Sequence, residues 1–200
     1  MPFSRSRPET SATLREFTAP GELASLFASL PSLARQPRGN GECVLVFPGF
    51  GGGDGSTALL RRYLSYLGYS VEGWGLGTNR GNVQDLLQQL VELVETQALV
   101  AGQPLRLVGW SLGGYLAREV ARDRPEAVDR VITMGSPVVG GPRYTLTAPI
   151  YKMAGMDFDA VEEAIRQREK TPLRVPVTAL YSRRDGIVHW EACIDRVSDC

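Results

Sequence analysis

The residues with the clearest chemical potential lie in the segment Gly109-Trp110-Ser111-Leu112-Gly113. Its spacing is G-x-S-x-G, in which the serine sits on a sharp turn between a strand and a helix. Glycine is needed two positions before and after the serine, because a larger side chain would collide there. Such a turn exposes the Ser111 hydroxyl and points the first helical amides at whatever it attacks. The spacing predicts a nucleophile; a serine that merely begins a helix is the alternative.

Two further segments have residue types that could complete a site around Ser111. Residues 48–56 form a loop so rich in glycine that its backbone amides can approach a ligand closely. Asp185 and Gly186 form an acidic turn, for which a purely structural turn aspartate is the alternative. Each of these segments follows an apolar run of strand length, as Ser111 does.

The elements that must position these loops alternate along the chain. The periodicity predicts strands at 43–47, 69–74, 105–107, 128–134 and 175–182, and helices at 57–67, 83–100, 112–124 and 157–170. Ser56 is a candidate cap for the first of these helices. Alternation predicts an α/β fold, in which a mostly parallel sheet is covered by helices. Ligands bind such sheets outside the carboxyl ends of the strands, so the three loops should meet there.

We expect one domain, because 200 residues that are 43% hydrophobic can bury one core but are few for two. Residues 1–40 are predicted to be a flexible lead-in with a short helix near 21–34, and residues 41–200 to be the domain. Residues 138–156 lack a clean period and are expected to form a loop or small cap over the site.

Composition argues against several classes of function. The 22 basic and 22 acidic residues balance, so no nucleic-acid partner is indicated. No apolar run approaches the roughly 20 residues of a membrane span, and no signal peptide is visible, which predicts a cytoplasmic protein. Cys43, Cys193 and Cys200 lack metal-ligand spacing and the chain has one histidine, so no metal is expected. Reduced cysteines are favoured over a disulfide between Cys193 and Cys200.

Three segments together resemble the α/β-hydrolase family, and more narrowly the bacterial lipases and esterases related to GPI inositol-deacylases. They are residues 46–52, 109–114 and 182–188. The resemblance covers roughly residues 40–200. It implies a serine esterase in which Ser111 is the nucleophile, Asp185 is the triad acid, and the backbone amides of Phe50 and Leu112 form the oxyanion hole. It implies a small-molecule or lipid ester as substrate and no cofactor, and it leaves the oligomeric state open.

The base departs from the family's pattern. There the triad histidine follows one more strand after the acid, whereas the one histidine here is His189, four residues after Asp185. Either the chain is truncated and lacks that histidine with a final strand and helix, or His189 replaces it. His189 could touch Asp185 if residues 187–192 were helical. We expect truncation.

The missing base leaves two other functions open beside ester hydrolysis. One is an inactive binding domain with a hydrolase fold, and the other is acyl transfer to an alcohol.

Several side chains near the predicted strand ends have both a functional and a structural interpretation. Trp74, Leu76, Trp110, Tyr144 and Tyr151 could line an acyl pocket, but such residues usually belong to the core. Only Trp110 is expected beside the site. Asn79 and Arg80 are expected to be loop residues rather than substrate ligands.

Overall fold

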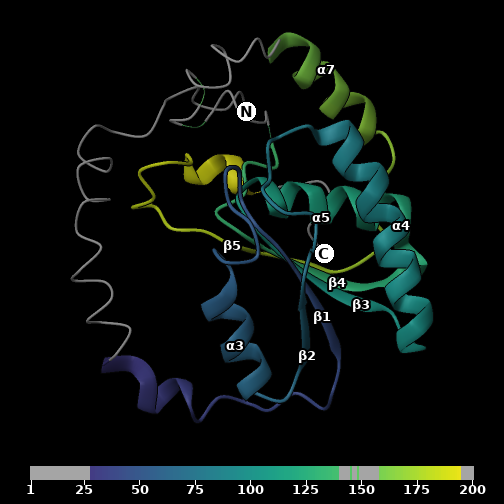
Figure 1. Cartoon of the computed structure of the whole chain (residues 1–200). Helices are drawn as coiled ribbons and strands as arrows, with labels where there is room; N and C mark the ends of the chain where they lie inside the picture. Colours follow the sequence, from purple (N-terminus) through teal and green to yellow (C-terminus); the bar gives the residue numbers. More distant parts are fainter. Residues whose placement is uncertain (1–27, 140–144, 146–147, 149–157, 195–200) are drawn as a thin grey trace.

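The computed structural model contains a five-stranded, all-parallel sheet (Figure 1) in the order β2-β1-β3-β4-β5. The strands are β1 (Cys43–Phe47), β2 (Ser70–Gly73), β3 (Leu105–Trp110), β4 (Val128–Met134) and β5 (Val177–Leu180). The structure describes residues 28–139, 145, 148 and 158–194, so residues 1–27 of the predicted lead-in and most of the predicted cap lie outside the described residues. Residues 28–33, within the short helix predicted near 21–34, are helical. The predicted α/β fold is confirmed.

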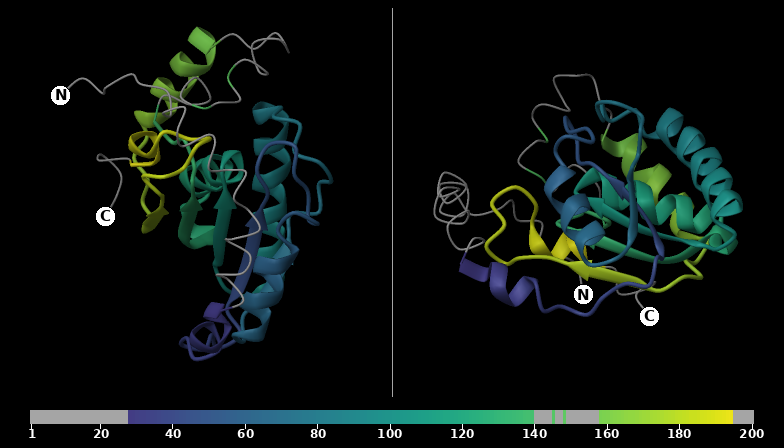
Figure 2. Two further views of the ribbon diagram at one scale, coloured as in Figure 1. Left: turned by 90° about the vertical axis from the view of Figure 1, so that its left-hand side faces the viewer. Right: turned by 60° about the horizontal axis from the view of Figure 1, so that its bottom comes forward.

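Helices cover both faces of the sheet. They are α3 (Ala58–Tyr66), α4 (Val83–Ala101), α5 (Leu112–Asp123) and α7 (Phe158–Glu169), with the short 3₁₀ helices η2 (Pro125–Ala127) and η4 (Trp190–Cys193). Helices α4 and α5 pack on one face and α3 on the other (Figures 1 and 2). Helix α7 lies at the end of the molecule farthest from α3.

Strand β1 shows how the sequence determines these layers. Its side chains alternate between the two faces of the sheet. Leu45 and Phe47 join the core beneath α4 and α5, whereas Val44 and Val46 join the core beneath α3. All four side chains are buried. A strand buried on both faces reads as a continuous apolar run, which is why residues 43–47 were recognisable as a central strand.

Local signals set most helix ends within a residue or two of the prediction. Helix α4, for example, ends at Gly102, whose φ of 65° is the left-handed conformation that glycine adopts easily. The predicted cap at Ser56 is wrong. The residue before α3 is Thr57, and the Ser56 hydroxyl instead donates to the Gly53 carbonyl oxygen at 2.7 Å.

Residues 187–192 do not form the α-helix through which His189 was to reach Asp185. Val188 forms an isolated antiparallel bridge with Thr145, and helical structure begins only at η4. His189 itself is extended, with φ −64° and ψ 123°. The bridge competes with helix formation, since Val188 pairs with a residue more than forty positions away.

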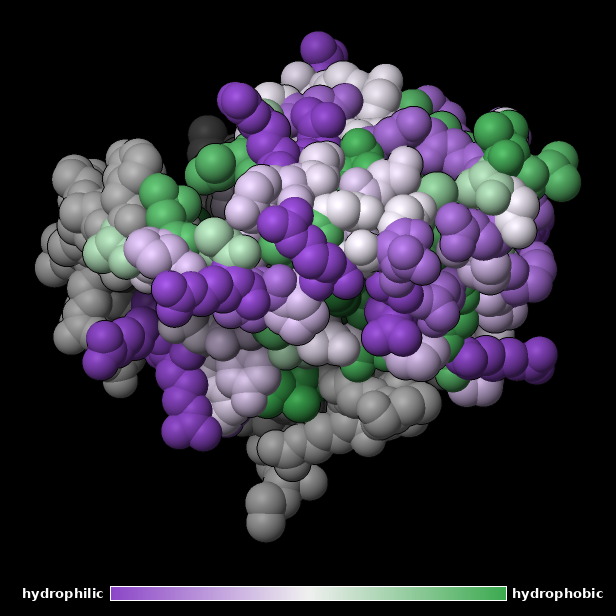
Figure 3. All heavy atoms as spheres, turned by 90° about the horizontal axis from the view of Figure 1, so that it is seen from below, coloured by the Kyte–Doolittle hydropathy of each residue, from purple (hydrophilic) through white to green (hydrophobic). Residues whose placement is uncertain are grey.

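The surface seen from below in Figure 1 is mainly hydrophilic, and its hydrophobic residues form small separate groups (Figure 3). None of the helices in the described ranges is both long and apolar enough to cross a bilayer.

Candidate active site

Ser111 lies on a strained turn between β3 and α5. Its φ of 53° and ψ of −122° make it the one non-glycine residue with positive φ in the part of the chain that the structure describes. Its N–H donates to the carbonyl oxygen of Met134 at 2.8 Å, which ties the turn to the end of β4. The Ser111 hydroxyl makes no capping hydrogen bond to α5. Backbone strain of this kind is typical of functional residues.

The glycines around Ser111 are required by close backbone contacts. A methyl group added to Gly109 would lie 2.4 Å from the carbonyl oxygen of Gly113 and from Cα of Gly114. One added to Gly113 would lie 2.4 Å from the carbonyl oxygen of Phe47. The strand and helix therefore cross at a distance that only glycine permits, as the G-x-S-x-G spacing predicts.

The glycine-rich loop after β1 lies against the Ser111 turn. A methyl group added to Gly49 would lie 3.3 Å from Cβ of Ser111. Gly49, Phe50, Ser111 and Leu112 all line one pocket. The two predicted oxyanion-hole residues and the predicted nucleophile are thus together, on adjacent loops at the carboxyl ends of β1 and β3.

Two polar side chains whose role the sequence analysis did not predict hold this loop. Asn79 is fully buried; its amide donates to the carbonyl oxygen of Pro48 at 3.0 Å and accepts the Gly81 N–H at 3.1 Å. The backbone of Asn79 also pairs with both Gly51 and Gly52 at 2.8 Å. Asn79 is therefore the main link between the glycine-rich loop and the loop after β2.

Asp54 makes a second link between these loops. Its carboxylate accepts the N–H groups of Trp74 at 3.0 Å and Gly75 at 3.2 Å. The sequence of a polar loop does not distinguish an aspartate or asparagine that links two loops by hydrogen bonds from one that is exposed to solvent. Only the approach of the two loops shows the difference.

Asp185 lies beside the end of β4, on the other side of Ser111 from the glycine-rich loop. Its Oδ2 would be 3.1 Å from a methyl group placed on Gly135, the residue that follows Met134. Its Oδ1 accepts the N–H groups of Ile187 at 2.8 Å and Val188 at 2.9 Å. The carboxylate is half-buried and faces the same pocket as Ser111.

Cys193 lies close to this carboxylate from the side of η4. Burial, together with the negative charge of Asp185, raises the pKa of the Cys193 thiol to about 12. Its side chain is 1% exposed, so it remains a neutral thiol in the folded protein.

His189, the remaining predicted site residue, is not among the residues that line the pocket. It precedes η4, and its ring lies near Trp190, with ring centroids 6.3 Å apart. The structure thus brings Ser111, Phe50, Leu112 and Asp185 to one pocket and leaves His189 outside its lining.

The pocket has a volume of about 500 Å³ and is mainly apolar. Besides the residues named above, its wall comes from the start of α4, from α5 and from α7; these residues include Val83, Leu112, Tyr115, Val161, Ala164 and Ile165. Trp110 also lines it and is 46% exposed, as a neighbour of the site, whereas Trp74 is 1% exposed and belongs to the core. A cavity of this size and character suits an apolar small molecule with one reactive polar group.

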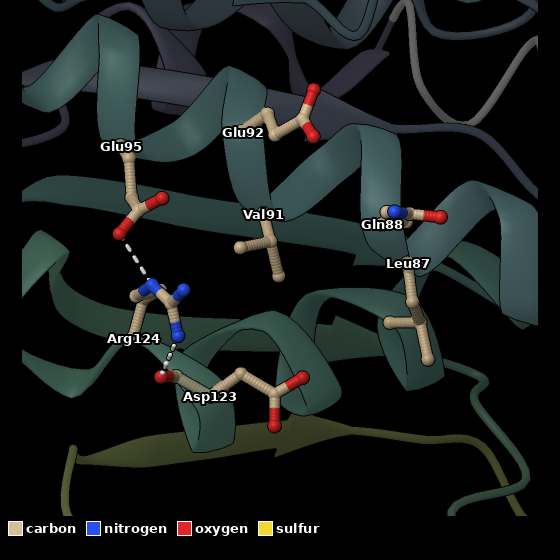
Figure 4. A pocket seen from close by; sticks show the side chains of 7 residues that line it. All are labelled: Leu87, Gln88, Val91, Glu92, Glu95, Asp123 and Arg124. Atoms are coloured by element: carbon tan, nitrogen blue, oxygen red, sulfur yellow. Dashed lines mark hydrogen bonds and ion pairs between the residues drawn. The ribbon is translucent and has the colours of Figure 1, made fainter.

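A second hollow, of about 540 Å³, lies between α4 and the end of α5 and shares no residue with the Ser111 pocket. Two of its side chains, Arg124 and Glu95, form an ion pair across the hollow (Figure 4). In the described part of the chain, no three His, Cys, Asp or Glu side chains gather in a group that could hold a metal ion.

Comparison with known families agrees with this geometry. Residues 20–155, more than half of the chain, match the family described as having the alpha/beta hydrolase fold. The chain belongs to the α/β-hydrolase family. The matched range includes Phe50, Ser111 and Leu112 and ends before Asp185. No curated protein sequence matches the chain.

Solved hydrolase structures share the fold. A monoacylglycerol lipase from Paleococcus ferrophilus is 18% identical, with a TM-score of 0.58 over 78% of this chain and 79% of that one. The Bacillus licheniformis lipase BlEst2 is 16% identical, with a TM-score of 0.58 over 82% and 83%. The metagenome-derived lipolytic enzymes LipS and LipT give 18% identity and a TM-score of 0.57 over 78% and 77%. At these identities the similarity is one of fold.

Proposed function

We propose that this α/β-hydrolase is a serine esterase that cleaves carboxylic esters through an acyl-enzyme. In this mechanism Ser111 attacks the ester carbonyl, the alcohol leaves, and water then releases the acyl group from the Ser111 oxygen. The observation that carries the proposal is the positive φ of Ser111, a residue that lines an apolar pocket. Backbone strain at a residue in a pocket supports a catalytic role.

The backbone amides of Phe50 and Leu112 are assigned to the oxyanion hole. They lie on the two loops that meet at Ser111, and the Leu112 amide is in the first turn of α5, where helical amides point outward. One such donor is worth roughly 3–4 kcal/mol of transition-state stabilisation. The hole needs no charged side chain.

The ester substrate is assigned from the pocket and from the fold relatives. The pocket wall is mostly apolar, so an acyl chain can be buried beside Ser111 without leaving polar groups unpaired. The relatives named above include two lipases and a pair of lipolytic enzymes. This favours an ester with an apolar acyl group over a charged substrate.

Asp185 is assigned as the acid that orients the catalytic base. It has one oxygen committed to the turn at Ile187 and Val188, and its other oxygen faces Gly135. His189 is the candidate base. It precedes η4 and does not line the pocket, so it must move toward Ser111 to accept the serine proton.

Labelling with a serine-reactive fluorophosphonate probe tests the proposal. We expect the full-length protein to be labelled and Ser111→Ala to lose the label, while Ser65→Ala, an exposed serine of α3, keeps it. His189→Ala should leave labelling intact if the base comes from elsewhere and abolish it if His189 is the base. A folded full-length protein that takes no label would overturn the proposal.

The second candidate is a binding domain that retains the fold and the pocket without turnover. The observation that favours it is the position of His189 outside the pocket lining. In that case the full-length protein binds apolar ligands but neither reacts with the probe nor hydrolyses p-nitrophenyl esters.

A further inference from the structure

One face of α7 connects the Ser111 pocket to a group of buried charges. Val161, Ala164 and Ile165 line the pocket. Arg168 lies three residues after Ile165, and positions spaced by three, four and seven residues share one face of a helix. The apolar residues 161, 164 and 165 and the guanidinium of Arg168 therefore lie on the same face of α7, with Arg168 nearer the carboxyl end.

Arg168 pairs with two carboxylates of α5. Its Nε contacts the carboxylate of Glu119, and its Nη2 donates to the Glu119 carbonyl oxygen at 3.2 Å and to Asp123 Oδ2 at 2.9 Å. Arg122 pairs with the other oxygen of Glu119 at 3.3 Å. We name these four residues the Arg168 cluster. Burial acts to lower the pKa of Arg168, but the hydrogen bonds and charges of Glu119 and Asp123 outweigh burial and raise it, so Arg168 stays protonated.

The Glu119 side chain is 3% exposed and cannot turn to solvent when its partners are removed. A buried carboxylate requires partners of opposite charge, so Arg168 is held firmly at this position. An exposed ion pair on the same helix offers a contrast. Arg166 pairs with Glu163 at 2.8 Å, but both side chains are more than half exposed.

The Arg168 cluster links α7 to α5, the helix that follows the nucleophile Ser111. Helix α5 begins directly after Ser111, and Glu119 lies eight residues further, roughly 12 Å along the helix axis. Few residues of α7 come close to the backbone of another described element. Side-chain contacts, among them the ion pairs of Arg168 and the burial of Ile165, therefore hold α7 against the rest of the molecule.

We propose that Arg168 is a positioning residue that, through Glu119 and Asp123, holds the apolar face of α7 over the Ser111 pocket and so sets the length of acyl chain that the pocket accepts. The substrate part rests on the proposed esterase function. We expect short acyl groups at Ser111 to make few contacts with α7 and long ones to pack on Val161, Ala164 and Ile165, which line the same pocket. Loss of the cluster should weaken binding of long chains selectively.

The test compares Arg168→Met with Arg166→Met, which removes the exposed pair from the same helix. We expect Arg168→Met to lower kcat/KM for p-nitrophenyl decanoate relative to p-nitrophenyl butanoate by about tenfold, mainly through KM, because ground-state contacts to the chain are lost. Arg166→Met should leave the ratio unchanged. Arg168→Lys keeps the charge but not the forked hydrogen bonds and should give an intermediate ratio.

A second readout needs no turnover. In the Ser111→Ala protein, isothermal titration with decanoate and butanoate measures binding directly, and Arg168→Met should weaken decanoate alone. If the protein hydrolyses neither ester, the esterase proposal fails while the binding ratio still tests the role of Arg168.

An unchanged decanoate-to-butanoate ratio in folded Arg168→Met overturns the proposal. Should Arg168→Met not fold, Arg168→Lys decides in its place, since it keeps a positive charge beside Glu119 and Asp123; an unchanged ratio there has the same meaning. Ala164→Leu checks the wall itself and should reduce decanoate binding without touching the cluster.

Discussion

The Ser111 turn and the Asp185 turn both lie at the carboxyl ends of the strands, but different interactions hold them. Ser111 follows β3, which has a strand on each side, and its neighbours contact backbone atoms at distances that only glycine allows. Asp185 follows β5, an edge of the described sheet, near the exposed side chains of Leu180, Tyr181 and Ile187. Close packing fixes the nucleophile side, whereas hydrogen bonds to one carboxylate fix the acid side.

This contrast predicts how each side responds to substitution. A side that is fixed by packing cannot accept an added atom, because the surrounding backbone has no room to move. A side that is fixed by hydrogen bonds near solvent loses less, since water replaces part of what is removed. The predictions below test this difference through the free energy of unfolding.

The largest effect is expected for Gly109→Ala. The new methyl group would lie 2.4 Å from backbone atoms of Gly113 and Gly114, so β3 and α5 must separate. We expect the free energy of unfolding, measured in urea, to fall by more than about 4 kcal/mol. Gly55→Ala, where the new methyl group meets open space, is the matched control and should change it by less than about 0.5 kcal/mol. Equal stability of the two variants would contradict the packing explanation.

Asn79→Ala should have the second largest effect. It leaves the Pro48 carbonyl and the Gly81 N–H without the buried amide that pairs with them. We expect a loss of about 2–3 kcal/mol in urea unfolding and slower probe labelling of Ser111, because the loop that carries Phe50 is released. Asn40→Ala, at an exposed position, should be neutral. A stable Asn79→Ala protein with unchanged labelling would mean that Asp54 and the backbone hydrogen bonds of residue 79 hold the loop without the side-chain amide.

Asn79 also shows where sequence reasoning ends. The strand at 43–47 and the helix at 83–100 were predictable because the spacing of apolar residues follows the buried face of a strand or helix. The spacing of Gly109, Ser111 and Gly113 was predictable because the strand-to-helix turn is local. The burial of Asn79 depends on two loops that approach each other from separate strands, and no local pattern encodes that approach.

The acid side illustrates the same limit. The four-residue spacing of Asp185 and His189 would bring them together only in a helix over 187–192, but the Asp185 carboxylate binds the N–H groups of Ile187 and Val188, and Val188 bridges to Thr145. The Arg168 cluster was equally invisible in the sequence, because an arginine on a helix is usually solvated. Long-range partners decided each of these cases.

Asp185 offers a smaller effect that separates its two roles. Asp185→Ala removes the acceptor of two backbone N–H groups and should lower the free energy of unfolding by about 1–2 kcal/mol. Asp185→Asn keeps an oxygen acceptor in the same turn and should be nearly as stable as the parent, yet lose ester hydrolysis if the carboxylate orients the base. Equal stability of the two variants in urea would show that the turn does not depend on this acceptor.

The smallest effect at neutral pH, and one that grows in alkali, is expected from Cys193. Its pKa is raised from the ordinary 9.0 of a thiol to about 12, by burial and by the charge of Asp185. A folded-state pKa above the unfolded value gives stability that is complete below pH 9 and is lost as pH rises toward 12. In a protein with Cys43 and Cys200 replaced by serine, unfolding stability should therefore fall more steeply above pH 9 than in the matched Cys193→Ala protein. Parallel curves would place the thiol in contact with water, and the acid side would then be more open than the 1% exposure of Cys193 indicates.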